Sequence, residues 1–125
     1  MKKSETTLKY LKDRFKFDDK QEMPIELKID RFHGLMGILK ALKFKVGAEI
    51  GSGIGIYAKF MCGKLKLEKL YCVEPWMAYK GYIERPIEKW QYRADGSYEK
   101  AKNRLAPYDA VEFVRKYSYD FILRI

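Results

Sequence analysis

The sequence predicts an α/β protein with a mainly parallel sheet, and three observations carry that prediction. A short apolar run at residues 44–50 leads into a loop with glycines at alternate positions, and a helix-like segment follows the loop. A second apolar run, residues 70–73, ends in Glu74. Around these runs helical and extended patterns alternate, which is typical of parallel strands joined by helical crossovers.

The elements before the glycine loop follow from local patterns. A helix is expected over residues 5–17, because leucine and phenylalanine side chains recur there at helical spacing. Residues 18–22 form a polar link, and Asp30 is placed to cap a second helix that ends near Leu42. The first strand is expected at residues 44–50, because such dense apolar residues suit a strand that is buried on both faces.

After the loop the chain is expected to continue with alternating helices and strands. Residues 75–96 are the exception, because Gly81, Pro86 and Gly96 interrupt any regular pattern in a segment rich in aromatic side chains. This segment suits a lid or wall over a ligand and a packed loop equally well. The expected elements are a helix at 54–62, a strand at 70–74, a helix at 97–106, and strands at 111–115 and 119–125.

The glycine loop and the two acids near it predict a nucleotide-type cofactor site. Gly51, Gly53 and Gly55 can take positive φ and let a ligand approach the backbone. Glu49 lies two residues before the first glycine. Glu74 lies roughly 20 residues beyond the loop, at the end of the second strand, where a carboxylate can accept hydrogen bonds from both ribose hydroxyls.

The details of the loop favour one family of cofactor sites over another. The dinucleotide fingerprint needs glycine or alanine three residues after its second glycine, and this chain has Ile56 there. Residues 49–55, E-I-G-S-G-I-G, instead resemble the first motif of the class I S-adenosylmethionine-dependent methyltransferases. Residues 72–76, C-V-E-P-W, resemble their second motif in a branch with Asp/Glu-Pro-Trp after strand two. The resemblance covers about residues 25–123.

This resemblance implies a Rossmann-like methyltransferase fold with sheet order 3-2-1-4 and an S-adenosylmethionine site at the carboxyl ends of the strands. In the family the glycine loop holds the methionine part and ribose, and the second acid binds the ribose hydroxyls. Residues after strand two cover the adenine, and the end of strand three adds polar contacts. The cofactor-binding residues implied here are Glu49, Gly51, Ser52, Gly53, Gly55, Glu74, Pro75, Trp76, Tyr117 and Ser118.

The resemblance also sets an expectation for domain organisation. The family domain continues through three further strands, whereas this sequence stops at the predicted fourth strand, residues 119–125. We therefore expect residues 1–22 to form an N-terminal helix and linker, and residues 23–125 to form a truncated cofactor-binding methyltransferase domain without its C-terminal half. A terminal fourth strand would present an open apolar edge, which favours self-association.

Composition limits the remaining function classes. The 125 residues are 47% hydrophobic, enough for one packed domain, and they contain no secretion signal and no apolar run that could span a membrane, so we expect a cytoplasmic protein. Cys62 and Cys72 lack metal-site spacing and are expected to be buried thiols, so no metal is predicted. The net charge is +9, but the basic residues are spread along the chain, which disfavours nucleic-acid binding.

The sequence therefore predicts methyl transfer to an oxygen or nitrogen atom of an unidentified small-molecule or sugar acceptor. Catalysis would come mainly from alignment of the acceptor with the methyl group. No catalytic base is assigned, because neither His33 nor Tyr82 has a pattern that supports the role. The alternative is a non-catalytic basic module that binds nucleic acid or a partner protein. A dinucleotide-dependent oxidoreductase is disfavoured by Ile56 and by the Glu-Pro-Trp element.

Overall fold

The computed structural model of the chain describes residues 3–79 and 87–122. The chain forms two compact units, Met1–Lys43 and Phe44–Ile125. The first unit contains helices α1 (Lys3–Phe15) and α2 (His33–Ala41), and thus takes in the predicted N-terminal segment together with the second predicted helix. The Asp30 carboxylate accepts a hydrogen bond from the Gly34 amide in the first turn of α2, as a capping side chain does.

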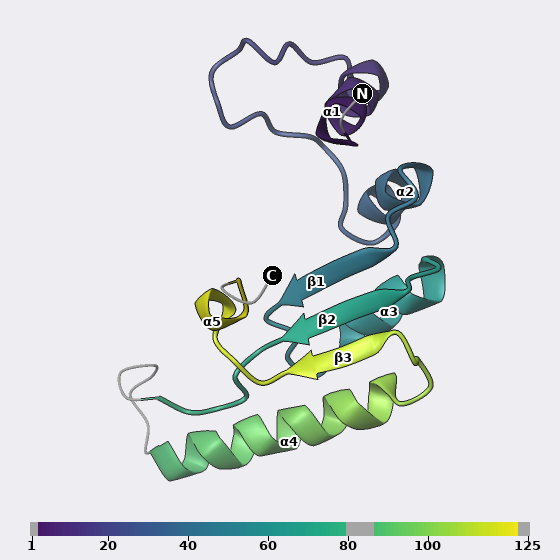
Figure 1. Cartoon of the computed structure of the whole chain (residues 1–125). Helices are drawn as coiled ribbons and strands as arrows, with labels where there is room; N and C mark the ends of the chain where they lie inside the picture. The colour runs from purple at the N-terminus through teal and green to yellow at the C-terminus, as the bar shows by residue number, and fades with distance from the viewer. Residues whose placement is uncertain (1–2, 80–86, 123–125) are drawn as a thin grey trace. The chain divides into compact units, whose positions relative to one another are not determined.

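The second unit is built around a parallel sheet of β1 (Val46–Ile50), β2 (Lys69–Val73) and β3 (Val111–Val114). In the part of the chain that the structure describes, the strands lie in the order β1-β2-β3, with β2 hydrogen-bonded on both sides (Figure 1). The predicted α/β class with a mainly parallel sheet is confirmed. All three strands therefore end at the same edge, where parallel α/β sheets commonly bind their ligands.

Helices cover both faces of this sheet. On one face, Phe113 of β3 packs edge-on against Tyr98 of α4 (Ile87–Leu105), and α3 (Ile56–Lys64) packs against both α4 and β2. On the opposite face, Tyr71 of β2 contacts Phe121 of α5 (Ser118–Ile122), with ring centroids 5.2 Å apart. The core lies on the α3 and α4 side of the sheet. Its most completely buried members in this unit are Ala58, Leu70, Cys72, Ala101 and Leu105. Val73 is equally buried, but strand alternation places it on the face that Tyr71 occupies.

The predicted last strand, residues 119–125, is wrong for the part that the structure describes. Ser118–Ile122 form helix α5, and residues 123–125 lie outside the described part. A strand parallel to β3 needs a crossover of a dozen or more residues, and only residues 115–118 separate the end of β3 from Tyr119. A helical turn instead buries Phe121 against Tyr71, so the proposed fourth-strand edge for self-association is not formed by these residues.

The fourth helix begins ten residues earlier than the sequence predicted. Residues 87–96 were assigned to an irregular segment, but they form the first half of α4. Gly96 costs the helix about 1 kcal/mol, yet apolar residues at helical spacing further along, such as Ala101 and Leu105, bury that helix against the sheet. Residues 80–86, which include Gly81, Tyr82 and Pro86, lie outside the described residues.

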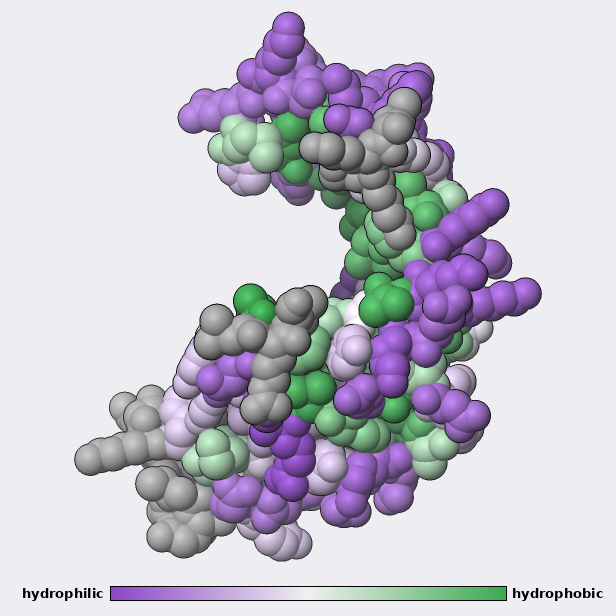
Figure 2. Space-filling view, viewed as in Figure 1, coloured by the Kyte–Doolittle hydropathy of each residue, from purple (hydrophilic) through white to green (hydrophobic). Residues whose placement is uncertain are grey.

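Hydrophilic side chains project from much of the visible surface, and apolar residues are exposed between them (Figure 2). Val46 and Ile50 of β1 are among the exposed large apolar residues. Among the helices that the structure describes, none combines the length and the apolar character that a membrane span requires.

Candidate functional site

The glycine loop after β1 uses its glycines in two different ways. Gly51, Gly53 and Gly55 all have positive φ, at 84°, 55° and 80°. A Cβ atom at Gly51 or Gly53 would meet no protein atom, so their neighbourhood is open space. A Cβ atom at Gly55 would lie 3.1 Å from Leu105 Cδ1 and 3.3 Å from Ala101 Cα. Gly55 therefore permits close packing of the loop on α4, whereas the first two glycines leave room for a ligand.

Gly53 ties the loop to the segment that follows β2. Its amide donates a hydrogen bond to Glu74 Oε1 at 2.9 Å, and its carbonyl accepts one from Trp76 Nε1 at 2.9 Å. The two bonds tie both the carboxylate and the indole to the backbone of one residue. The predicted glycine loop and the predicted acid thus meet at the carboxyl ends of β1 and β2.

Trp76 forms the back of the site. Its side chain is only 2% exposed, and its ring packs against Tyr98 and Phe113 with centroids 5.0 and 6.0 Å away. The indole N–H is satisfied by Gly53, as a buried tryptophan requires. The side chain therefore fixes the loop from behind and shows little surface to a ligand.

Helix α4 holds the segment after β2 through Gln91. The Gln91 Oε1 atom accepts a hydrogen bond from the Ala78 amide at 3.0 Å, and Nε2 donates to the Trp76 carbonyl at 3.4 Å and to Asp95 at 2.8 Å. Arg104, further along the same helix, donates to the carbonyl of Ile54 in the glycine loop. Helix α4 thus anchors both the glycine loop and the segment after β2.

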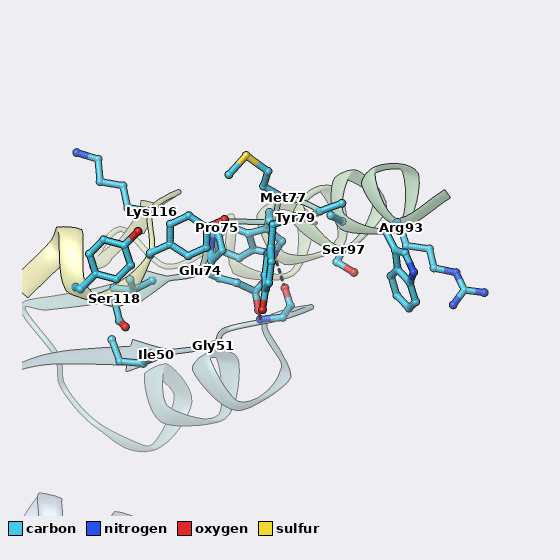
Figure 3. A pocket seen from close by; sticks show the side chains of 18 residues that line it. Ile50, Gly51, Glu74, Pro75, Met77, Tyr79, Arg93, Ser97, Lys116 and Ser118 are labelled. Atoms are coloured by element: carbon cyan, nitrogen blue, oxygen red, sulfur yellow. Dashed lines mark hydrogen bonds between the residues drawn. The ribbon is translucent and has the colours of Figure 1, made fainter. Parts of the chain in front are cut away.

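A cavity of about 460 Å³ opens at this edge of the sheet, within the range usual for small-molecule sites (Figure 3). Its walls come from the glycine loop, the segment after β2, one face of α4 and the turn from β3 into α5. The lining residues are Ile50, Gly51, Gly53, Val73, Glu74, Pro75, Trp76, Met77, Ala78, Tyr79, Trp90, Arg93, Ala94, Ser97, Lys116, Tyr117, Ser118 and Tyr119.

Most residues that the sequence nominated lie on this cavity, and three do not. Those that line it are Gly51, Gly53, Glu74, Pro75, Trp76, Tyr117 and Ser118. Glu49 lies opposite Cys72 in the β1–β2 register, with its side chain on the α3 face of the sheet. Ser52 is buried, with its hydroxyl directed to the Glu49 carbonyl. Gly55 packs on α4, so these three residues shape the loop from behind.

The carboxylate at the centre of the cavity has a perturbed acidity. Burial raises the pKa of Glu74 above the 4.5 of an ordinary glutamate, and the hydrogen bond from Gly53 partly offsets that rise. The two thiols, Cys62 on α3 and Cys72 on β2, are less acidic than an ordinary cysteine. Burial raises the pKa of Cys72 to about 11 and also raises that of Cys62, and the charge of Glu49 adds to both shifts.

Sequence reasoning missed the wall that α4 supplies. Trp90, Arg93, Ala94 and Ser97 line the cavity at helical spacing, so a helix assigned over residues 87–105 would have placed them on one face. Tyr119 was missed as well. The aromatic segment after β2 was expected to be either a ligand wall or a packed loop, and Tyr79 and Trp90 belong to the cavity wall.

The remaining candidates bear less on the site. His33 begins α2 in the first unit, and Tyr82 lies outside the described residues. Within the part of the chain that the structure describes, no three histidine, cysteine or acidic side chains gather as a set of metal ligands. Comparisons of the chain with protein-family models, with curated proteins and with solved structures found no match.

Proposed function

We propose that the chain binds S-adenosylmethionine in this cavity and belongs to a Rossmann-like methyltransferase domain of class I. The proposal depends on the two hydrogen bonds that Gly53 forms, one with Glu74 and one with Trp76. These bonds join residues 49–55 and residues 72–76, the two segments that resemble the family's motifs, in one cavity at the carboxyl edge of a parallel sheet. That edge is where such sheets bind nucleotides.

The residues present fit a ligand with a ribose and a flat base. The Glu74 carboxylate lines the cavity, and Gly53 occupies only its Oε1 atom, so acceptor capacity remains for ribose hydroxyls. The open space beside Gly51 and Gly53 admits a ligand against the backbone. Pro75 offers an apolar surface next to Glu74 for the base, and Tyr117 and Ser118 supply hydroxyl groups.

The chemistry would be methyl transfer to an oxygen or nitrogen atom of a small-molecule or sugar acceptor. When bound, the cofactor would supply a sulfonium methyl group. The acceptor atom that bonds to this methyl carbon would release its proton to water, and the sulfur would keep the electrons of the broken bond. The contribution of this chain is alignment, because the cavity holds donor and acceptor together and an oriented encounter lowers the barrier by several kcal/mol. We assign no general base.

The test is isothermal titration of the protein with S-adenosylmethionine and S-adenosylhomocysteine, using Glu74→Gln and Glu99→Gln variants. Glutamine keeps an oxygen for the Gly53 amide but loses the charge that strengthens hydrogen bonds from ribose. We expect micromolar binding by the wild-type chain and an affinity about 10- to 100-fold lower for Glu74→Gln. Glu99 is exposed on α4 outside the cavity, so its variant should bind like the wild type.

Absence of binding by the folded wild-type chain would overturn the proposal, as would unchanged affinity in Glu74→Gln. Binding of DNA or RNA that weakens with salt, in a chain without affinity for S-adenosylhomocysteine, would instead support the non-catalytic basic module.

A further inference from the structure

Three tyrosines form a continuous aromatic wall on one side of the cavity. The rings of Tyr117 and Tyr119 are parallel within 2°, with centroids 5.6 Å apart, and Tyr79 meets Tyr117 edge-on at 6.0 Å. All three residues line the cavity. Tyr119 is 62% exposed and Tyr79 44% exposed, so this wall contributes little to the core. We call these three residues the tyrosine wall.

The charges in the cavity are separated along its length. Lys116 lies at one end and Arg93 at the other, with Glu74 between them in the view of Figure 3. Within the described residues Lys116 forms no ion pair. An anionic group next to the tyrosine wall would gain from Lys116, and it would be held away from the carboxylate of Glu74.

We propose that the outer face of Tyr119 and Lys116 bind the methyl acceptor, with Tyr117 supporting the Tyr119 ring from the cofactor side, and that this acceptor is a planar aromatic carboxylic acid. Its ring extends the Tyr117–Tyr119 stack over the outer face of Tyr119, because aromatic rings gain from offset stacking beyond the area they bury. Its carboxylate lies by Lys116. Ile50, at the end of β1, lines the same cavity and is exposed, so an acceptor on this side can approach the glycine loop. The inference rests on the proposed function, because the aromatic acid is a methyl acceptor only if the cavity binds S-adenosylmethionine.

The experiment is a titration with 4-hydroxybenzoate, followed by NMR, of protein saturated with S-adenosylhomocysteine. Cyclohexanecarboxylate carries the same charge without a planar ring, and 4-hydroxybenzamide keeps the ring without the charge. We expect 4-hydroxybenzoate to bind at least about tenfold more tightly than either control ligand. Tyr119→Leu should lower its affinity by about tenfold, because leucine keeps apolar volume but cannot stack. Lys116→Gln should remove the preference for the acid over the amide.

Tyr92→Leu is the matched control, because Tyr92 is 82% exposed on α4 and lies outside the cavity. That variant should bind 4-hydroxybenzoate like the wild type. Circular dichroism of each variant establishes that it is folded before the titration.

Equal affinity for 4-hydroxybenzoate and cyclohexanecarboxylate would overturn the inference, as would unchanged affinity in folded Tyr119→Leu. So would competition between 4-hydroxybenzoate and S-adenosylhomocysteine, because the outer face of Tyr119 would then belong to the cofactor site. The proposed function fails separately. If the folded wild-type chain does not bind S-adenosylhomocysteine, the same titration of the cofactor-free protein still tests the stacking on Tyr119.

Discussion

At Glu74, burial and a backbone hydrogen bond act on the pKa of one carboxylate in opposite directions. The Gly53 amide stabilises the ionised form of Glu74, whereas burial opposes that form, and burial is the larger effect on the pKa. Because the pKa of Glu74 is higher in the folded chain than in the unfolded chain, its ionisation lowers the stability of the folded state at neutral pH. That cost disappears as the pH falls through the raised pKa.

Ligand affinity should respond to pH in the opposite direction. Only the carboxylate accepts hydrogen bonds from two ribose hydroxyls with full strength, so affinity for S-adenosylhomocysteine should fall as Glu74 takes up a proton. We expect the fall to begin at a higher pH than an ordinary glutamate would give, and to approach about tenfold per pH unit below the pKa. Calorimetric titrations between about pH 7.5 and 4.5 measure it. In Glu74→Gln this fall of affinity with pH should be absent. A wild-type affinity that does not change with pH would contradict the role of Glu74 as the acceptor for the ribose hydroxyls.

At the scale of elements, helix α4 fixes the site from behind. It packs against Gly55, donates from Arg104 to the loop and holds the segment after β2 through Gln91. Its one interior weakness is Gly96, where an added Cβ would meet nothing within 4 Å. The helix and the loop therefore respond differently when a glycine is replaced by alanine.

We expect Gly96→Ala to stabilise the protein and Gly55→Ala to destabilise it. Alanine at an open helix position lowers the entropy of the unfolded chain and should add about 0.5–1 kcal/mol to the free energy of unfolding. Alanine at Gly55 must take a φ of 80° and press on Leu105 and Ala101, which should cost more than about 1 kcal/mol. Urea unfolding curves of both variants measure the difference. Equal stabilities would show that the contact between loop and α4 is not maintained in solution.

The elements also show which parts of the fold a sequence can predict. The loop after β1 and the acid after β2 were predicted because their requirements are local, namely positive φ at Gly51 and Gly53 and a carboxylate at a strand end. The helix at residues 118–122 was not predicted, because their apolar residues suit either a strand or a helix. The length of the connection from β3 decides between the two. The first half of α4 was missed because a glycine such as Gly96 predicts a helix break. A glycine ends a helix only where the packing of that helix does not compensate for its cost, and α4 packs on the sheet.

At the scale of the whole molecule, positive charge exceeds negative charge by nine. Five ion pairs between described residues join partly or largely exposed side chains, and such pairs contribute little to stability. Repulsion between the excess lysine and arginine side chains therefore dominates the surface electrostatics.

Added salt should for this reason stabilise the chain. Raising NaCl from about 50 to 300 mM shortens the Debye length and screens the net repulsion more than it weakens exposed pairs. We expect Tm to rise, and a gain of about 0.5 kcal/mol would correspond to about 2 °C. Melting curves followed by circular dichroism measure the shift, with KCl as a check against a specific sodium effect. A falling Tm would show that the ion pairs outweigh the repulsion.

The burial of Trp76 also has an optical consequence. An indole that is shielded from water and hydrogen-bonded to the Gly53 carbonyl emits at shorter wavelength than one in solvent, and any movement of the glycine loop changes its surroundings. Trp90, the second of the two tryptophans, lines the same cavity from α4. Intrinsic fluorescence thus offers a label-free signal of what enters this cavity, with one emitter behind the loop and the other on α4.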